Sequence, residues 1–336
     1  MYKTSILKKL VVISNSSLNL LELKKRYSFL KYKNFFNKKI LILINSNEEI
    51  NQINHYHKKN FLKKSNDKIL IGFDGRRLII ENSIFENKIK IYIDKNIPNL
   101  DLINILDDLI LIKLIQSKFL PIHSSGFSLN KIGKLFASFG GVGKTRIVLE
   151  ALKFSDKSRI FDEWCLIKNS TLYPLRKDVL LMDYDISENQ KFFNKFDLYR
   201  AKISMVIPFK KLNNILRILR LSLPFKYVSF KNVSLFNIKN IFFISQKNNV
   251  KTKFKKIKKN FFAKKILNNF KHEKNRLFRL VLVNNSIKKF NNKINLAKTY
   301  HDLLIKLLKN CKFKKILIDK NNKNFNSLFL KILQDD

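Results

Sequence analysis

Cysteine, proline and glycine are all scarce in this chain, whose 336 residues include 2 Cys, 5 Pro and 7 Gly. Cys165 and Cys311 lie far apart and lack the spacing of metal ligands, which excludes a disulfide framework and favours a reducing compartment. No window approaches the roughly 18 uncharged apolar residues that a membrane-spanning helix needs. The apolar run LVVIS near the N-terminus is too short for a secretory signal. We therefore expect a soluble, cytoplasmic protein without a membrane span.

Acidic residues are scarce too: 25 Asp and Glu stand against 68 Lys and Arg, which gives a formal net charge of +43. Such a charge would normally indicate nucleic acid or an anionic membrane as the partner. The excess is mostly Lys, however, whereas Arg is the better residue for bidentate phosphate and base contacts. The charge is also spread along the chain with abundant Asn, Ile and Phe, a mixture that A+T-rich codons would produce. We interpret most of the Lys as solvated surface and do not expect nucleic acid as a specific partner.

The first hundred residues are patterned mainly as strands. The segments 39–45 and 88–94 are short apolar or alternating runs, and 68–82 has the pattern of a hairpin that turns at Asp74-Gly75. A mostly buried helix is predicted over 100–118, after Pro98-Asn99. This part of the sequence predicts a β-rich α+β unit over residues 1–118, with no obvious chemistry and no assigned role.

The pattern changes from Phe119 onward. The predicted elements are strands at 126–129 and 134–139 around a turn at 130–133, a helix ending near 154, a strand at 238–246, helices at 259–270 and 300–310, and a strand at 313–319. The helix at 259–270 should bury one face, made of Phe261, Phe262, Ile266, Leu267 and Phe270. The Lys- and Asn-rich tract 247–260 is expected to form loops or solvated helix surface.

Three of the seven glycines lie within four positions, directly before Lys144-Thr145 in SFGGVGKT (138–145). In a P-loop, successive backbone N–H groups converge on phosphate oxygens at a helix N-terminus, and glycines let the backbone approach. The lysine reaches the β- and γ-phosphates, and the Thr hydroxyl is placed to ligate Mg²⁺. Only the first glycine of G-x-x-x-x-G-K-[ST] is missing, replaced by the small Ser138. The predicted phosphate-binding residues are Gly140, Gly141, Val142, Gly143, Lys144 and Thr145.

The same letters also form the core of the ParA/MinD motif KGGVGKT. That motif needs a lysine where this chain has Phe139 and usually a second Thr where it has Arg146. Its loop also lies near the start of the chain, whereas some 130 residues precede this one. These differences disfavour a partitioning ATPase.

Two adjacent acids, Asp162 and Glu163, follow Lys144 by 18 residues. That distance holds one helix, a short turn and one strand, so both carboxylates should lie at the end of the strand after the loop helix. Paired carboxylates near a bound triphosphate can hold Mg²⁺ and orient or deprotonate an attacking hydroxyl. The alternative is a pair of ordinary loop acids, but acids are rare here and this position favours function. The predicted metal ligands are Thr145, Asp162 and Glu163.

These motifs together resemble the HPr kinase/phosphorylase superfamily, which is related in its nucleotide site to phosphoenolpyruvate carboxykinase. Those proteins pair G-x-x-G-x-G-K-[ST] with Asp-Asp or Asp-Glu shortly after one helix, and the kinase branch carries His-Gly on a strand leading into the loop. Here PIHSSGFSL, GKLFASFGGVGKTRIVLEAL and FDEWCLI follow in that order. The stronger resemblance covers about residues 121–175, and a weaker one extends towards the C-terminus.

The resemblance implies an α/β P-loop kinase core over residues 119–336, behind the β-rich unit. It implies that Lys144 and Thr145 bind the phosphates and Mg²⁺, and that the paired acids handle the metal and base chemistry. It also implies that His123 lies near the transferred phosphate, although a histidine of this kind is more often a packing or capping residue. By matching position, the predicted catalytic residues are Asp162, Glu163 and His123.

The sequence departs from that family at several positions. Ser138 replaces the leading glycine, Glu163 replaces the commoner second Asp, and Ser124 and Ser125 separate His123 from Gly126. We find no counterpart of the C-terminal glycine-rich signature associated with recognition of HPr. The phosphotransfer site is therefore expected to persist, while HPr itself is in doubt as the substrate.

The leading hypothesis is an enzyme: a phosphotransferase dependent on ATP and Mg²⁺ that phosphorylates a hydroxyl, of the serine type, on a protein or a small molecule. One alternative is a nucleotide-binding regulator or scaffold without efficient catalysis. A second, prompted by the charge, is an ATPase stimulated by nucleic acid. The sequence does not define the acceptor, and it is compatible with a homo-oligomer.

Overall fold

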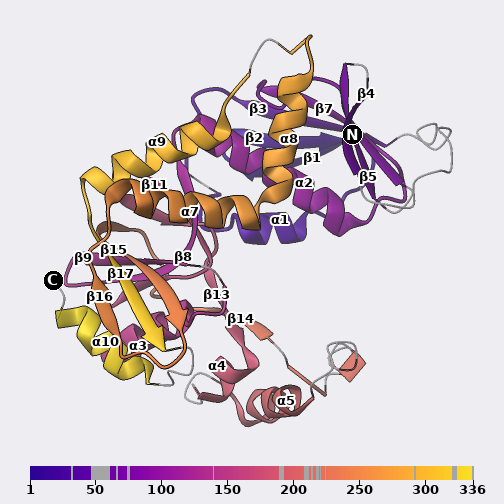
Figure 1. Ribbon diagram of the computed structural model, residues 1–336. Coiled ribbons are helices and arrows are strands. Elements are labelled where there is room, and N and C mark those ends of the chain that lie inside the picture. The colour runs from indigo at the N-terminus through magenta and orange to yellow at the C-terminus, as the bar shows by residue number, and fades with distance from the viewer. Residues whose placement is uncertain are drawn as a thin grey trace. The chain divides into compact units, whose positions relative to one another are not determined.

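The computed structural model describes residues 1–31, 33–46, 61–65, 67–73, 76–138, 140–188, 193–207, 212, 215–216, 219, 221–223, 225–290, 293–319 and 324–334 (Figure 1). The protein is a mixed α/β chain with a seven-stranded and an eight-stranded mixed β-sheet, and the described residues form nine helices. Two compact units are present. The first comprises Met1–Ile122, Leu166–Arg176 and Ile257–Asn310, and the second comprises His123–Cys165, Lys177–Lys256 and Cys311–Asp336.

The sequence predicts a single boundary between residues 118 and 119, whereas each of the two compact units consists of several chain segments. The first break does fall close to it, but 166–176 and 257–310 belong to the first unit rather than to a continuous domain over 119–336. The helices of segment 257–310 complete the hydrophobic core and the ion pairs of the first unit. Strands β8 (Leu120–Leu129) and β11 (Trp164–Lys168) each run from one unit into the other, and β12 (Thr171–Pro174) belongs to the first.

The first unit is built on the seven-stranded sheet, in the order β1-β2-β3-β7-β6-β5-β4. Its strands are β1 (Tyr2–Leu7), β2 (Leu10–Ser14), β3 (Ile40–Ser46), β4 (Phe61–Ser65), β5 (Lys68–Phe73), β6 (Arg76–Ile80) and β7 (Lys88–Ile93). The central pairs β2–β3 and β3–β7 are parallel and the others are antiparallel. This confirms the β-rich first unit, including the predicted β5–β6 hairpin, whose turn residues Asp74-Gly75 lie outside the described residues. The alternating Ile89, Ile91 and Ile93 are all buried, as predicted.

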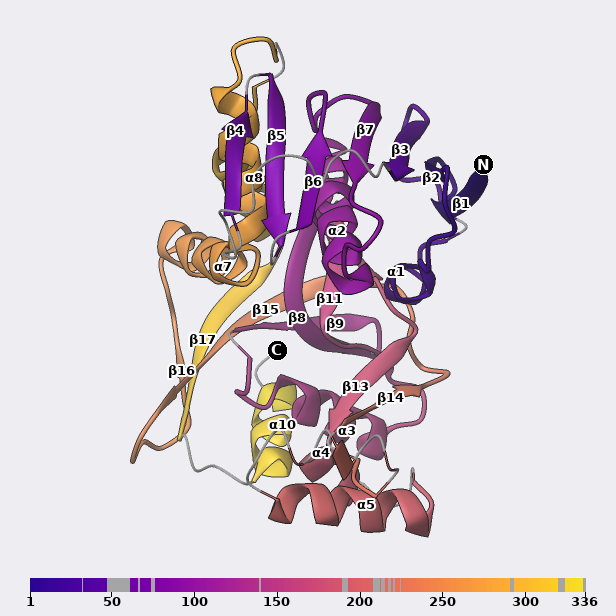
Figure 2. The ribbon, with the colours of Figure 1, turned by 90° about the vertical axis from the view of Figure 1, so that its right-hand side faces the viewer.

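Five helices accompany this sheet: α1 (Leu21–Arg26), α2 (Asn99–Gln116), α7 (Lys259–Glu273), α8 (Asn275–Ser286) and α9 (Leu296–Lys309). Helix α8 packs beside β4 and β5 and contacts α2 (Figure 2), and α7 packs on α9. The predicted helices at 100–118, 259–270 and 300–310 are confirmed. The predicted buried face of α7 is wrong at one position, because Phe261 is exposed while Phe262, Ile266, Leu267 and Phe270 are buried.

An ion-pair cluster around the buried Asp107 joins α2 to the segment 257–310. Asp107 accepts hydrogen bonds from the Tyr27 hydroxyl at 2.8 Å and from Lys274 Nζ at 2.7 Å, and it pairs with Arg26 at 2.8 Å. Burial alone would raise the pKa of Asp107, but the charges of Lys274 and Arg26 outweigh it and hold that pKa below its ordinary value. A buried carboxylate is tolerated only when it is paired in this way. These contacts place residues 257–310 in the first unit.

The second unit contains the strand and helix around the glycine-rich loop. Its strands β10 (Arg159–Phe161), β8, β9 (Ile132–Ala137), β15 (Phe236–Lys247), β17 (Lys312–Asp319) and β16 (Lys253–Lys255) pair in that order. The pairs β9–β15 and β15–β17 are parallel, and the other three are antiparallel. The strand predicted from 126 begins earlier, at Leu120, and so includes His123. The Lys-rich tract expected to be loop or helix contains β16, which pairs with β17.

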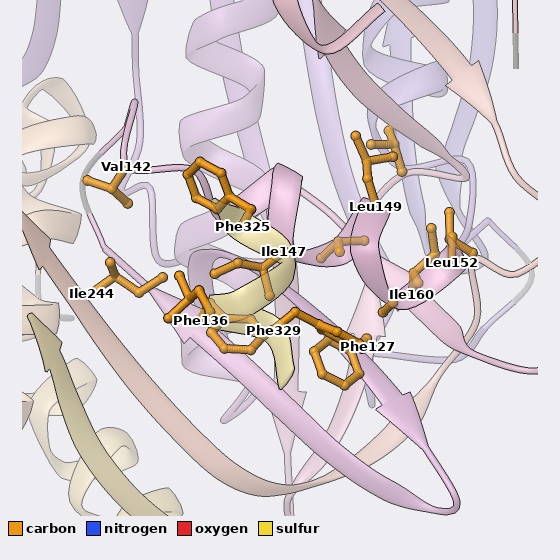
Figure 3. Close-up of a cluster of buried hydrophobic side chains, with 14 of the residues drawn as sticks. Phe127, Phe136, Val142, Ile147, Leu149, Leu152, Ile160, Ile244, Phe325 and Phe329 are labelled. Atoms are coloured by element: carbon orange, nitrogen blue, oxygen red, sulfur yellow. The ribbon is translucent and has the colours of Figure 1, made fainter. Parts of the chain in front are cut away.

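Helix α3 (Lys144–Phe154) follows the loop and buries its apolar face against α10 (Phe325–Gln334). Figure 3 shows Ile147 of α3 gathered with Phe136 of β9 and Phe329 of α10. The strand pair β13 (Asp178–Met182) and β14 (Phe225–Ser229) and the helices α4 (Asp183–Glu188) and α5 (Lys195–Val206) complete the unit. In neither unit do the described helices include one that is long and apolar enough to cross a membrane.

Candidate functional site

The register of the second sheet brings three chain segments to one edge. Strands β9 and β10 both pair antiparallel with β8 and therefore run in the same direction, so their carboxyl ends share this edge. The glycine-rich loop leaves the end of β9, and Asp162 follows the end of β10. On β8, Gly126 lies opposite both Leu135 and Phe161, which places the preceding residues, Ser125 and His123, beside the loop. The residues that precede Gly126 on β8, the loop after β9 and Asp162 after β10 therefore lie together, although they are far apart in the sequence.

The loop glycines fill two different roles. Gly141 and Gly143 have φ values of +78° and +86°, in the left-handed region that glycine adopts at little cost. At Gly143 a Cβ would also lie 2.2 Å from the ring of Phe325. At Gly140, in contrast, φ is not left-handed, and a Cβ would meet no atom of the described residues within 4 Å apart from its chain neighbours. The backbone therefore requires Gly141 and Gly143, whereas at Gly140 the structure leaves open space above the chain.

Ser138 is more than a tolerated replacement for the leading glycine. The residue is 1% exposed, and its hydroxyl donates to the carbonyl oxygen of Ile244 in β15 at 2.6 Å. Its own carbonyl accepts from Lys144 Nζ at 3.2 Å, so the lysine side chain lies back over the loop. The side chain that breaks the usual motif therefore fastens the start of the loop to the neighbouring strand.

Asp162 lies directly against the start of α3. The Thr145 hydroxyl lies 3.0 Å from Oδ2 and 3.2 Å from Oδ1 of this carboxylate, and the Ser125 hydroxyl donates to Oδ1. The carboxylate is 6% exposed, and burial raises the pKa of Asp162 although both hydroxyls and the charge of Lys144 oppose the shift. A hydroxyl and a buried carboxylate of this kind are oxygen ligands suited to Mg²⁺.

Glu163 and His123 both line the pocket around the loop, and different contacts hold each of them in place. Glu163 has a left-handed φ of 66°, unusual for a residue with a Cβ, and its carbonyl accepts from the Ser124 N–H at 2.6 Å. Such strain is found where the surroundings hold a residue in place, often at functional sites. The ring of His123 stacks on Trp164 with centroids 5.3 Å apart and an interplanar angle of 19°, which fixes its plane. Eight of the nine predicted site residues line this pocket: His123, Gly140, Gly141, Gly143, Lys144, Thr145, Asp162 and Glu163. Val142 does not, because its side chain is buried in the hydrophobic cluster around α3 (Figure 3).

The pocket has a volume of about 660 Å³, within the range of small-molecule sites, and those of its lining residues that the structure describes all belong to the second unit. Sequence reasoning missed one side of it. Arg146 Nε lies 3.3 Å from Asp185 Oδ1, and the guanidinium lies 4.9 Å from the ring centroid of Tyr184 and 5.2 Å from that of Phe325. Burial raises the pKa of Asp185 to about 6. The acids of MDYD (182–185), in a chain poor in acids, were the available signal.

Two observations indicate that these residues could hold a nucleotide together with a divalent cation. The space above Gly140 and Gly141 would admit phosphate oxygens to the backbone, and Thr145 and Asp162 present hard oxygen atoms beside it. Among the described residues there is no group of three or more His, Cys, Asp or Glu side chains able to hold a metal by themselves.

No protein-family model matches this sequence, and no curated protein matches it.

Proposed function

We propose that the second unit is an ATP- and Mg²⁺-dependent phosphotransferase that phosphorylates a hydroxyl on a protein or a small molecule, of the kind its sequence resembles. The observation that carries the proposal is the approach of the Thr145 hydroxyl to the Asp162 carboxylate, at 3.0 Å, beside the open backbone of the glycine-rich loop. A chance glycine-rich turn before a helix would have no reason to place a buried carboxylate there.

The side chains divide into three tasks. Gly140 to Lys144 would cradle the phosphates, with Lys144 leaving the Ser138 carbonyl to contact them. Thr145 and Asp162 would hold the cation, since they already contact each other. Glu163 is half-buried and directly follows Asp162 in the sequence, and it would accept the proton of the attacking hydroxyl. His123, fixed by Trp164, would lie beside the same group.

When bound, ATP supplies the γ-phosphoryl group and Mg²⁺ neutralises charge on the phosphates. The acceptor oxygen forms a bond to the γ-phosphorus, the bond to the β-phosphate bridging oxygen breaks, and ADP leaves. The hydroxyl proton goes to Glu163. Catalysis of this type depends mostly on positioning and electrostatics, which the buried pocket would provide.

The test separates binding from turnover. Wild-type protein should bind ATP in the presence of Mg²⁺ and form ADP faster with an acceptor than without one, and Lys144→Ala should abolish both. Glu163→Gln should retain binding and lose turnover by about 10²- to 10⁴-fold, as expected when a general base is removed. The matched control is Asp156→Asn, an exposed acid of the same unit. If wild type and Lys144→Ala bind ATP equally poorly, the proposal is wrong; if ATP binds but no acceptor is phosphorylated, a regulatory nucleotide site is the better description.

A further inference from the structure

Lys113, in the last turn of α2, is almost completely buried, with 2% of its surface exposed. Its Nζ donates to the backbone carbonyl of Glu86, and among the described residues it has no carboxylate within ion-pair distance. Burial lowers the pKa of Lys113 to about 7, with only a partial offset from the carboxylate of Glu86, which itself accepts a hydrogen bond from Asn82. A buried ammonium group costs free energy unless a charged partner compensates it.

Lys113 lines a pocket of about 410 Å³ in the first unit, together with Lys38, Lys118 and Lys168. The described lining residues include no Asp or Glu, so no protein carboxylate balances these four lysines within the pocket. Phe36 and Phe85 also line it, although each ring is largely buried. Lys168 Nζ lies 4.4 Å from the centroid of Phe119, which limits where this long side chain can go. The pocket therefore concentrates positive charge and offers only small parts of the Phe36 and Phe85 rings as apolar surface.

Lys118 occupies a position where glycine would be the favoured residue. Its φ is +62°, and it closes α2: the Phe119 N–H donates to the Leu114 carbonyl at 3.0 Å and the Lys118 N–H to the Ile115 carbonyl at 2.9 Å. This is the Schellman arrangement, whose left-handed residue is usually glycine. The two bonds also occupy carbonyl groups at the helix end that would otherwise repel an anion. The side chain of this lysine lines the pocket, beside the end of the helix that carries Lys113.

We propose that this pocket of the first unit binds a small organic anion, whose phosphate or carboxylate group contacts Lys113, Lys118 and Lys168 and whose apolar part lies against Phe36 and Phe85. The anion supplies the negative charge that Lys113 lacks. The site consists only of first-unit residues and does not depend on the phosphotransfer proposed for the second unit.

The experiment uses the full chain carrying Lys144→Ala, so that the glycine-rich loop does not bind the probes. Phenyl phosphate and benzoate, at millimolar concentration, are compared with neutral benzyl alcohol by thermal unfolding and by calorimetric titration. At least one of the two anions should raise the Tm of the parent and benzyl alcohol should not, since a ligand that binds only the folded state stabilises it. Whichever anion binds more tightly identifies the headgroup as phosphate or carboxylate.

Three variants decide the assignment. Lys113→Met should fold at least as stably and lose the anion-dependent shift, whereas Lys8→Met, which removes an exposed lysine of the same unit, should keep it. Lys118→Gly should raise the Tm without ligand and weaken anion binding about three- to tenfold, a pattern that a purely structural lysine would not give. The proposal is overturned if no anion stabilises the parent more than it stabilises Lys113→Met, or if Lys118→Gly binds the anion as tightly as the parent.

Discussion

Two glycines of the loop, three residues apart, should respond in opposite ways to the same substitution. Gly140→Ala places a methyl group where, apart from its chain neighbours, no atom in the described part of the chain lies within 4 Å, at a backbone angle that alanine tolerates. Its stability should stay within about 1 kcal/mol of wild type, and a small increase is reasonable because alanine has less freedom in the unfolded chain. If phosphate oxygens occupy the space above the loop, the same methyl group should weaken ATP binding about tenfold or more.

Gly143→Ala meets two obstacles in the protein itself. The left-handed φ of +86° costs a residue with a Cβ about 1–2 kcal/mol. The new Cβ would lie 2.2 Å from the ring of Phe325, which is 8% exposed in the core around α3 and α10. Moving that ring should cost about another 1–3 kcal/mol, as overpacking of cores does. The sum is a loss of about 2–5 kcal/mol in the free energy of unfolding.

The comparison needs urea unfolding of both variants and a titration with ATP and Mg²⁺. The expected result is a stable Gly140→Ala variant that binds ATP poorly and a destabilised Gly143→Ala variant. Normal ATP binding by Gly140→Ala would show that the open space above the loop is not the phosphate position. Equal destabilisation of the two variants would refute the structural distinction between them.

Three further predictions concern single side chains. Ser138→Gly restores the usual motif and yet should lower stability by about 1–2 kcal/mol, because it removes the buried hydrogen bond to the Ile244 carbonyl; urea unfolding of this variant measures the loss. Asp107→Ala should cost about 3–5 kcal/mol at neutral pH, because it removes the buried carboxylate that the partly buried Arg26 and Lys274 contact. Since the folded-state pKa of Asp107 lies below 3.8, that stabilisation is present above pH 3.8 and is lost as the pH falls through the folded value, so unfolding at pH 7 and below pH 3 should show the difference shrinking. The pKa of Asp185 is raised from 3.8 to about 6, so wild type loses stability as the pH rises through this interval. Unfolding of Asp185→Asn across the same range should show the variant gaining on wild type, and a constant difference would contradict the raised pKa.

The elements around the loop could be predicted because their signals are local. Periodicity and spacing predicted β9, the glycine-rich turn, α3 and β10. The position of Asp162, 18 residues after Lys144, was enough to place the carboxylate at the end of a strand. Because β10 and β9 both pair with β8, the Asp162 carboxylate comes within 3.0 Å of the Thr145 hydroxyl.

The composition of the first unit could not be predicted, because it depends on contacts between distant segments. Asp107 and Asp108 read as interruptions in an otherwise apolar helix, and their partners Lys274 and Arg276 lie more than 160 residues later. In a chain with 68 basic residues, nothing distinguishes those two from the rest. The same holds for Arg146, which the sequence offered only as a departure from another motif and which the fold places against Asp185.

Burial, rather than abundance, separates the informative lysines from the others. Among the described residues only Lys113, Lys134 and Lys144 are buried lysines, and each donates to a backbone carbonyl. Lys134 reaches the Ile332 carbonyl near the end of α10 and lines neither of the two pockets, so its role is to fasten that helix. Lys113 and Lys144 each lie at a pocket, where a ligand could replace the carbonyl with a full negative charge. Because a charged hydrogen bond is stronger than one to a neutral carbonyl, these two positions have the most to gain from an anion. Within a net charge of +43 we therefore propose two specific anion sites, one in each unit, and the experiments above test both.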